Sequence, residues 1–161
     1  MQRLILLRHG EAEAHAASGR DLDRALTAAG VTAVARTAKA LAAAKTVPDV
    51  ALVSTAKRTR ETWAEAKAQF PLSTDVFKSE IYNTNPTTLL ALARECEADT
   101  VMIVGHNPSL QGLALDLLAR QGAPASLVAR MEARFPPATA AVFSFHDDRP
   151  ELDALLLGSL V

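Results

Sequence analysis

The chain has 161 residues, and its 17 lysines and arginines against 18 aspartates and glutamates give a formal net charge of −1. This length fits one domain spanning residues 1–161, because domains commonly contain about 100–200 residues. The balanced charge argues against a dedicated nucleic-acid or anionic-membrane binder. The content of 49% hydrophobic residues excludes a disordered chain, and the single cysteine excludes a disulfide scaffold.

The N-terminus contains an apolar run of only four residues, from Leu4 to Leu7. A signal peptide needs about 7–15 apolar residues and a membrane helix needs about 20. We therefore expect a cytoplasmic protein without membrane association, whose fold begins almost at the first residue.

Short apolar runs alternate along the chain with longer segments that have helical spacing. In chain order we predict a strand at 3–7, a helix at 27–45, a strand at 50–54, a helix at 58–70, a strand at 75–78, a helix at 87–97, a strand at 100–105, a helix at 108–120, and strands at 140–146 and 152–157. The last two strands flank the sequence DDRP, which predicts a hairpin at a sheet edge.

This alternation predicts parallel βαβ units and therefore an α/β fold. We expect a three-layer αβα sandwich with a mostly parallel central sheet and an antiparallel edge strand. In such sheets the functional groups gather beyond the carboxyl ends of the strands.

Polar or charged side chains follow three of the predicted parallel strands, whose ends meet at one edge of the sheet. They belong to Arg8 and His9, to Arg58 one turn into the helix after its strand, and to His106 and Asn107. Phosphoryl transfer needs fixed cationic donors, and a guanidinium group stays charged and can bond two oxygens at once. We therefore predict a phosphoryl-transfer site in which Arg8 and Arg58 clamp the anion. Asn107 could line the site or only cap the helix that follows it.

Imidazole titrates near neutral pH, so His9 is the candidate nucleophile, with its second ring nitrogen held by a backbone carbonyl. Gly10 would let the backbone approach the phosphate closely. His106 could bond the transferring oxygens as an imidazolium or as a neutral N–H donor. A third arginine is expected from the sequence GRDLDRALT, where Arg24 lies nearer the following helix than its rival Arg20.

Four motifs in order along the chain resemble those of the histidine phosphatase superfamily, which has the phosphoglycerate-mutase-like fold. They are LLRHGEAE, RALTAAG, VSTAKRTRETW and VGHNPSL, spanning residues 4–110. Within the superfamily the chain is similar to small bacterial phosphohistidine phosphatases of the SixA type. The resemblance places phosphate-binding arginines at Arg8, Arg24 and Arg58 and the second catalytic histidine at His106.

The resemblance implies a two-step reaction in which His9 becomes phosphorylated and water then hydrolyses the phosphohistidine. It also implies that no metal or other cofactor is needed, since the arginines and His106 supply positive charge. Larger relatives use a carboxylic acid to protonate the leaving group. Glu80 is the candidate for that acid here, although a surface position is about equally compatible with the sequence.

The short chain leaves little room for a lid over the site. An open pocket suits a phosphorylated protein, such as a histidine-phosphotransfer domain, or a small phosphoester held mainly by its phosphate. Free phosphate or sulfate is also expected to fit this pocket. We therefore favour a phosphohistidine phosphatase. The alternatives are a phosphomonoesterase acting on a small metabolite and a phosphate-binding module without turnover.

Overall fold

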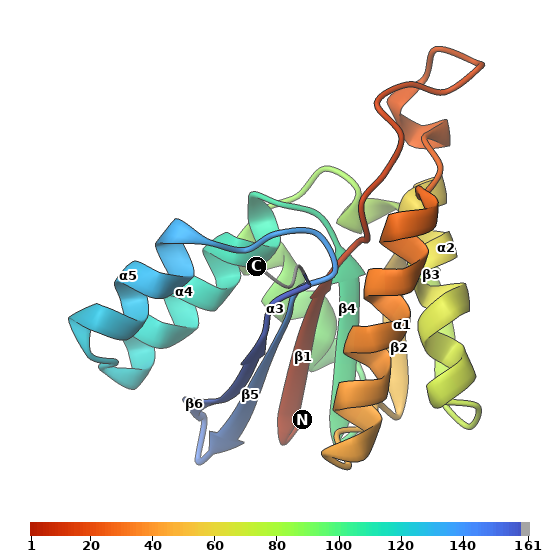
Figure 1. Cartoon of the computed structure of the whole chain (residues 1–161). Helices are drawn as coiled ribbons and strands as arrows, with labels where there is room; N and C mark the ends of the chain where they lie inside the picture. Colours follow the sequence, from red (N-terminus) through yellow and green to blue (C-terminus); the bar gives the residue numbers. More distant parts are fainter. Residues whose placement is uncertain (159–161) are drawn as a thin grey trace.

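The computed structural model describes residues 1–158. Its strands form one six-stranded sheet in the order β3-β2-β4-β1-β5-β6 (Figure 1). They are β1 (Arg3–Arg8), β2 (Val50–Ser54), β3 (Thr74–Lys78), β4 (Thr100–Gly105), β5 (Ala140–His146) and β6 (Arg149–Leu156). Strands β1 to β4 are parallel, whereas β5 pairs antiparallel with both β1 and β6. The predicted mostly parallel sheet with an antiparallel edge is thus confirmed.

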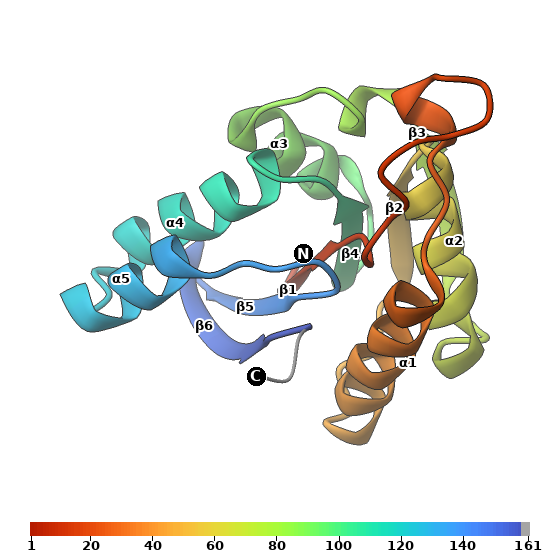
Figure 2. The ribbon, with the colours of Figure 1, turned by 45° about the horizontal axis from the view of Figure 1, so that its top comes forward.

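Helices cover both faces of this sheet, as the three-layer prediction requires (Figures 1 and 2). The helices are α1 (Ala28–Ala43), α2 (Lys57–Ala66), α3 (Pro86–Glu95), α4 (Ser109–Gln121) and α5 (Ala125–Ala133). Helices α1 and α2 pack on one face, and α3, α4 and α5 pack on the other. None of the helices within residues 1–158 is long and apolar enough to cross a membrane.

The alternation of side chains along β1 divides the core into two halves. Leu4 and Leu6 pack with the apolar residues of α3 and α4, whereas Ile5 and Leu7 pack with those of α1 and α2. Successive side chains of a strand point to opposite faces of its sheet, so a strand covered on both sides must be apolar throughout. This is why the central strands appear in the sequence as uninterrupted apolar runs.

The C-terminal part of the chain differs from the predicted elements in two places. The sequence analysis missed α5, a short helix that follows Pro124 and buries Met131 completely. The second strand of the hairpin begins at Arg149 rather than at residue 152. Asp147 and Asp148 both have positive φ angles, 49° and 63°, and form the turn alone. Pro150 is tolerated because β6 is an edge strand.

The carboxyl ends of the four parallel strands lie along one edge of the sheet. Arg8 at the end of β1 pairs in register with Gly105 of β4, and Ser54 of β2 pairs with Lys78 of β3. Two loops with short 3₁₀ turns rise above this edge and meet there, one at Asp21–Asp23 and one at Ser79–Ile81 (Figure 2). The sequence features that predicted a site thus converge on this edge.

Candidate active site

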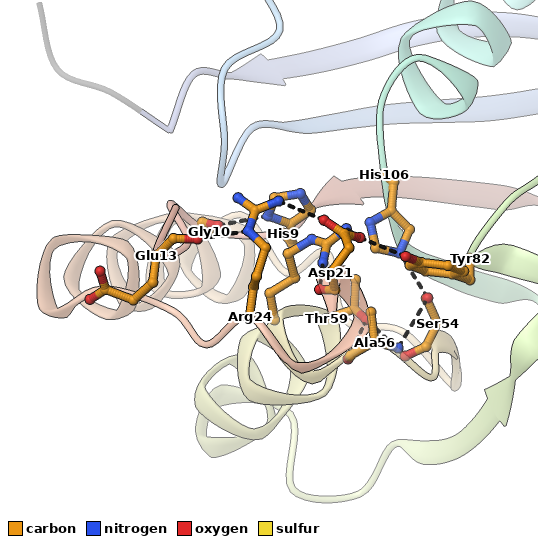
Figure 3. Close-up of polar contacts among 11 residues, drawn as sticks. His9, Gly10, Glu13, Asp21, Arg24, Ser54, Ala56, Thr59, Tyr82 and His106 are labelled. Carbon is orange, nitrogen blue, oxygen red and sulfur yellow. Dashed lines mark hydrogen bonds and ion pairs between the residues drawn. The ribbon is translucent and has the colours of Figure 1, made fainter. Parts of the chain in front are cut away.

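Two histidine rings lie side by side at the carboxyl edge of the sheet (Figure 3). The ring centroids of His9 and His106 are 5.4 Å apart. His9 follows β1 and His106 follows β4, and the backbone N–H of His9 donates to the carbonyl of Gly105 at 3.1 Å. The parallel pairing of β1 with β4 therefore brings together two histidines that are far apart in the sequence.

A hydrogen bond from its own ring fixes the tautomer of His9. Nδ1 donates to the carbonyl oxygen of Gly10 at 2.7 Å, so the ring proton is on Nδ1. Burial, opposed by this hydrogen bond and assisted by the charges of Arg58, Arg8 and Arg24, lowers the pKa of His9 from 6.5 to about 4. At neutral pH the ring is therefore uncharged, and Nε2 has a free lone pair.

Close packing around Gly10 supports this arrangement. The backbone N–H of Gly10 donates to the hydroxyl of Thr62 at 3.0 Å. A Cβ atom at position 10 would lie only 2.8 Å from the carbonyl oxygen of Gly30 at the start of α1, and one at Gly30 would lie 2.2 Å from the carbonyl oxygen of Glu11. Both glycines are thus required by the close approach of two backbone segments.

His106 is more buried than His9, with only 6% of its surface exposed. Its Nε2 lies 2.8 Å from the hydroxyl oxygen of Ser54, and its other ring nitrogen, Nδ1, is buried without a hydrogen-bond partner. The rings of His106 and Tyr82 meet edge to face, with their centroids 5.5 Å apart. Burial first, and then the positive charge of Arg58, lowers the pKa of His106 from 6.5 to about 3.

The guanidinium groups of Arg8 and Arg58 each donate a hydrogen bond to a backbone carbonyl, and each retains an N–H group without a partner. Nη1 of Arg8 donates to the carbonyl of Phe135 at 2.8 Å, and Nη1 of Arg58 donates to the carbonyl of Asp21 at 2.9 Å. Burial lowers the pKa of Arg8, although an arginine remains charged at neutral pH. In each of the two side chains Nε is buried and has no partner.

Three buried nitrogens of this site therefore have no hydrogen-bond partner, namely Nε of Arg8, Nε of Arg58 and Nδ1 of His106. Leaving a buried N–H group unpaired costs roughly 1–3 kcal/mol. A tetrahedral oxyanion offers several acceptor oxygens to donors that come from different directions. Among residues 1–158, no group of three or more histidine, cysteine, aspartate or glutamate side chains is arranged to hold a metal ion. The donor set is suited to binding an oxyanion.

Asp21 is the polar residue of the site that the sequence analysis missed. Its carboxylate accepts hydrogen bonds from the hydroxyl of Tyr82 at 2.6 Å, from Nη1 of Arg24 at 2.8 Å and from Nη2 of Arg58 at 3.0 Å. These bonds, that of Tyr82 above all, hold the pKa of Asp21 well below its usual range, and the bond to Asp21 raises the pKa of the Tyr82 hydroxyl. Asp21 lies three residues before Arg24 in the sequence GRDLDRALT. This spacing of an acidic and a basic side chain was the sequence signal that could have indicated their contact.

Of the two rival arginines, Arg24 lies at the site and Arg20 does not. Nε of Arg24 donates to the carbonyl of Glu13 at 2.7 Å, and the charge of Arg24 lowers the pKa of His9. The side chain of Arg20 is 65% exposed, and its ion-pair partner is Asp23 at 3.6 Å.

In the structure the side chains of Asn107 and Glu80 hydrogen-bond to groups other than the two histidines. Nδ2 of Asn107 donates to Gln111 at 3.1 Å and to the carbonyl of Phe135 at 3.3 Å, and its Oδ1 accepts from the backbone of Gln111 near the start of α4. Glu80 is exposed and accepts a hydrogen bond from Ser79 at 3.4 Å. In the described chain, neither side chain has a hydrogen bond or ion pair with the two histidines, Arg8 or Arg58.

The lowered histidine pKa values predict that the protein loses stability as the pH falls below 6.5. In the unfolded chain a histidine binds its proton near pH 6.5, whereas in the folded chain His106 does so only near pH 3. Between these values the unfolded state holds more protons, which costs about 2 kcal/mol of folding stability at pH 5 for such a histidine. We expect denaturant unfolding at pH 7.5 and pH 5 to show this loss.

A His106→Gln variant should lose less stability between the two pH values, because the glutamine side chain does not titrate. His146→Gln, which changes an exposed histidine on β5, should retain the wild-type pH dependence. An unchanged pH dependence in His106→Gln would contradict the lowered pKa of His106.

Comparison with known proteins supports the relationship that the motifs indicate. The model of the histidine phosphatase superfamily (branch 1) matches residues 4–79. A solved structure from Agrobacterium tumefaciens, provisionally assigned as the phosphohistidine phosphatase SixA, is 32% identical, covers 96% of this chain and 97% of its own, and superposes with a TM-score of 0.85. A structure from Nakamurella multipartitia with the same provisional assignment is 28% identical over 96% of this chain and 94% of its own, with a TM-score of 0.81.

A structure of the protein histidine phosphatase SixA complexed with tungstate has the same fold, with a TM-score of 0.76, 21% identity and 97% of each chain covered. The sheet order and the paired histidines at its carboxyl edge define a phosphoglycerate-mutase-like protein. The chain belongs to the histidine phosphatase superfamily, whose members include hydrolases.

Proposed function

We propose that this protein is a phosphatase that removes phosphoryl groups from phosphohistidine in signalling or phosphotransfer proteins, with His9 as its nucleophile. The observation on which the proposal chiefly rests is the state of His9. Its ring is neutral, its proton is on Nδ1 facing the carbonyl of Gly10, and its Nε2 has a lone pair beside a cluster of cationic donors. A neutral imidazole with an oriented lone pair is what nucleophilic attack on phosphorus requires.

The reaction would proceed in two steps. The lone pair of His9 Nε2 forms a bond to phosphorus while the bond to the leaving nitrogen breaks, and the leaving imidazole keeps the electron pair and takes a proton from water. A second water then attacks phosphorus, the bond to Nε2 breaks with its electron pair returning to the ring, and the proton of this water passes to solvent. In both steps Arg8, Arg58 and His106 would donate hydrogen bonds to the phosphoryl oxygens.

Two carboxylates near the site bear on the substrate class. Asp21 remains ionised at neutral pH, because its three hydrogen-bond donors lower its pKa, so it is not a proton donor. Glu80 is exposed and lacks contact with the histidines. An alkoxide leaving group needs a positioned acid, whereas a phosphohistidine has a good leaving group and depends less on one. The carboxylates therefore favour phosphohistidine as the substrate over alkyl phosphates.

The direct test compares two kinds of substrate. Purified protein is mixed with a histidine-phosphotransfer domain phosphorylated on histidine and, separately, with an alkyl phosphate, and phosphate release is followed. We expect faster turnover of the phosphohistidine domain, unaffected by a chelator because the arginines supply the positive charge. Faster turnover of the alkyl phosphate would instead identify a phosphomonoesterase, and binding of phosphate without turnover of either would identify a binding module.

Glu80→Gln tests whether Glu80 acts as a general acid. We expect this variant to hydrolyse both substrates at the wild-type rate to within about twofold, whereas losing a positioned general acid costs about 10²–10⁴-fold. Steady-state rates on the alkyl phosphate are the sensitive measurement, because that leaving group most needs a proton. A large loss confined to the alkyl phosphate would show that Glu80 moves to the substrate and serves as its acid.

A further inference from the structure

A neutral histidine has only one ring N–H, so His106 can donate to a phosphoryl oxygen from only one of its two nitrogens. These nitrogens have different surroundings. Nε2 lies 2.8 Å from the hydroxyl oxygen of Ser54, whereas Nδ1 is buried without a partner. Figure 3 shows Nε2 on the side of Ser54 and the other ring nitrogen on the side of His9 and Asp21. The position of the single proton therefore decides whether His106 offers a donor or a lone pair to an anion.

The hydrogen bonds around Ser54 assign the direction of its bond to His106. Ser54 is completely buried, and its hydroxyl oxygen accepts from the backbone N–H of Ala56 at 3.4 Å. The hydroxyl of Thr59 donates to the carbonyl of Ser54 at 2.8 Å. The hydroxyl hydrogen of Ser54 is left to be donated, and Nε2 of His106 is the acceptor within hydrogen-bond distance.

We infer that Ser54 is a positioning residue that donates its hydroxyl hydrogen to Nε2 of His106 and so places the ring proton on Nδ1. In this tautomer the buried Nδ1–H joins Nε of Arg8 and Nε of Arg58 as a third donor to a bound phosphoryl group. In the other tautomer Nδ1 would present its lone pair to the anion, which is repulsive. The inference deepens the proposed function, on which the role of the donor rests.

The fold keeps this contact in place. Ser54 is the last residue of β2 and His106 directly follows β4, and these two strands are paired neighbours in the sheet. Tyr82, whose ring meets that of His106 edge-on, does not compete for the ring nitrogens because its hydroxyl donates to Asp21. The geometry of His106 is thus set by Ser54 from one side and by an aromatic ring edge from another.

The test uses ¹⁵N-labelled protein at neutral pH, in which correlations between ring nitrogens and ring protons distinguish the two histidine tautomers. In the wild type we expect the proton of His106 on Nδ1, with Nε2 accepting a hydrogen bond. In Ser54→Ala we expect the proton to distribute between both nitrogens. The kcat for the phosphohistidine domain should then fall about 10-fold, a loss typical of residues that orient a functional histidine.

Thr59→Ala is the matched control, because it removes a completely buried hydroxyl from the same turn without touching His106. It should keep the wild-type tautomer and kcat, even where it lowers the melting temperature as much as Ser54→Ala does. Ser54→Thr, which restores a hydroxyl, should recover the wild-type tautomer.

Two results would overturn the inference: a wild-type His106 protonated on Nε2, or a Ser54→Ala variant whose His106 tautomer is unchanged. Absence of phosphatase activity in every variant, together with the expected tautomers, would instead refute the proposed function and leave the assignment of the Ser54 hydrogen bond intact.

Discussion

Replacing His9 by alanine should abolish phosphate release, with kcat reduced by about 10⁴-fold or more, as for other enzymes that lose their nucleophile. The reason is that the attacking lone pair is on Nε2 of this ring, and the group that hydrogen-bonds to the ring, the carbonyl of Gly10, cannot replace it as a nucleophile. Single-turnover measurements with a phosphohistidine domain give the sharpest readout, because they are independent of product release.

His146→Ala is the control for this experiment. His146 is exposed at the end of β5 and should be dispensable, so the variant is expected to turn over at the wild-type rate. Circular dichroism would verify that both variants are folded. A His9→Ala protein with full activity would exclude a phosphohistidine intermediate at this position.

Arg58→Lys should lower kcat/KM by about 10²–10³-fold, the loss usual for a preorganised donor to a developing oxyanion. A lysine keeps the charge but has a compact ammonium group in place of a planar fork. It cannot bond the backbone carbonyl and the carboxylate of Asp21 while also presenting the donor that Nε of Arg58 provides. Rates measured over a range of substrate concentrations would separate the effect on kcat from that on KM.

Arg60→Lys offers a matched comparison within α2. Arg60 is two residues further along the helix and exposed, so the same chemical change there should leave the rate within about twofold of the wild type, as for most surface substitutions. Equal rates for Arg58→Lys and Arg60→Lys would mean that the fork of Arg58 is not used in the reaction.

Much of the fold follows from the sequence because local patterns and the parallel topology agree. Uninterrupted apolar runs such as 101–104 fit strands covered on both faces, and the ends of parallel strands lie at one edge. The structure does bring His9, His106, Arg8 and Arg58 to that edge. Short elements were harder to predict, and α5 was missed because its nine residues leave little length over which a helical spacing can repeat.

The finer features of the site depend on side-chain contacts that no sequence period reveals. Asp21 lies in an irregular loop, and its three donors come from that loop, from α2 and from the segment after β3. The bond between Ser54 and His106 likewise joins two different strand ends. Glu80 was a candidate because it follows β3, but a position after a strand does not specify where a side chain points.

The central claim, that His9 takes the phosphoryl group, is tested most directly by trapping the phosphorylated enzyme. The protein is mixed briefly with a histidine-phosphotransfer domain that carries a radioactive phosphoryl group, the reaction is stopped in alkali, and the two proteins are separated by size. The account predicts label on this chain that survives alkali, is lost in acid, and maps to His9. Full turnover without such label, or an acid-stable label on another residue, would contradict it.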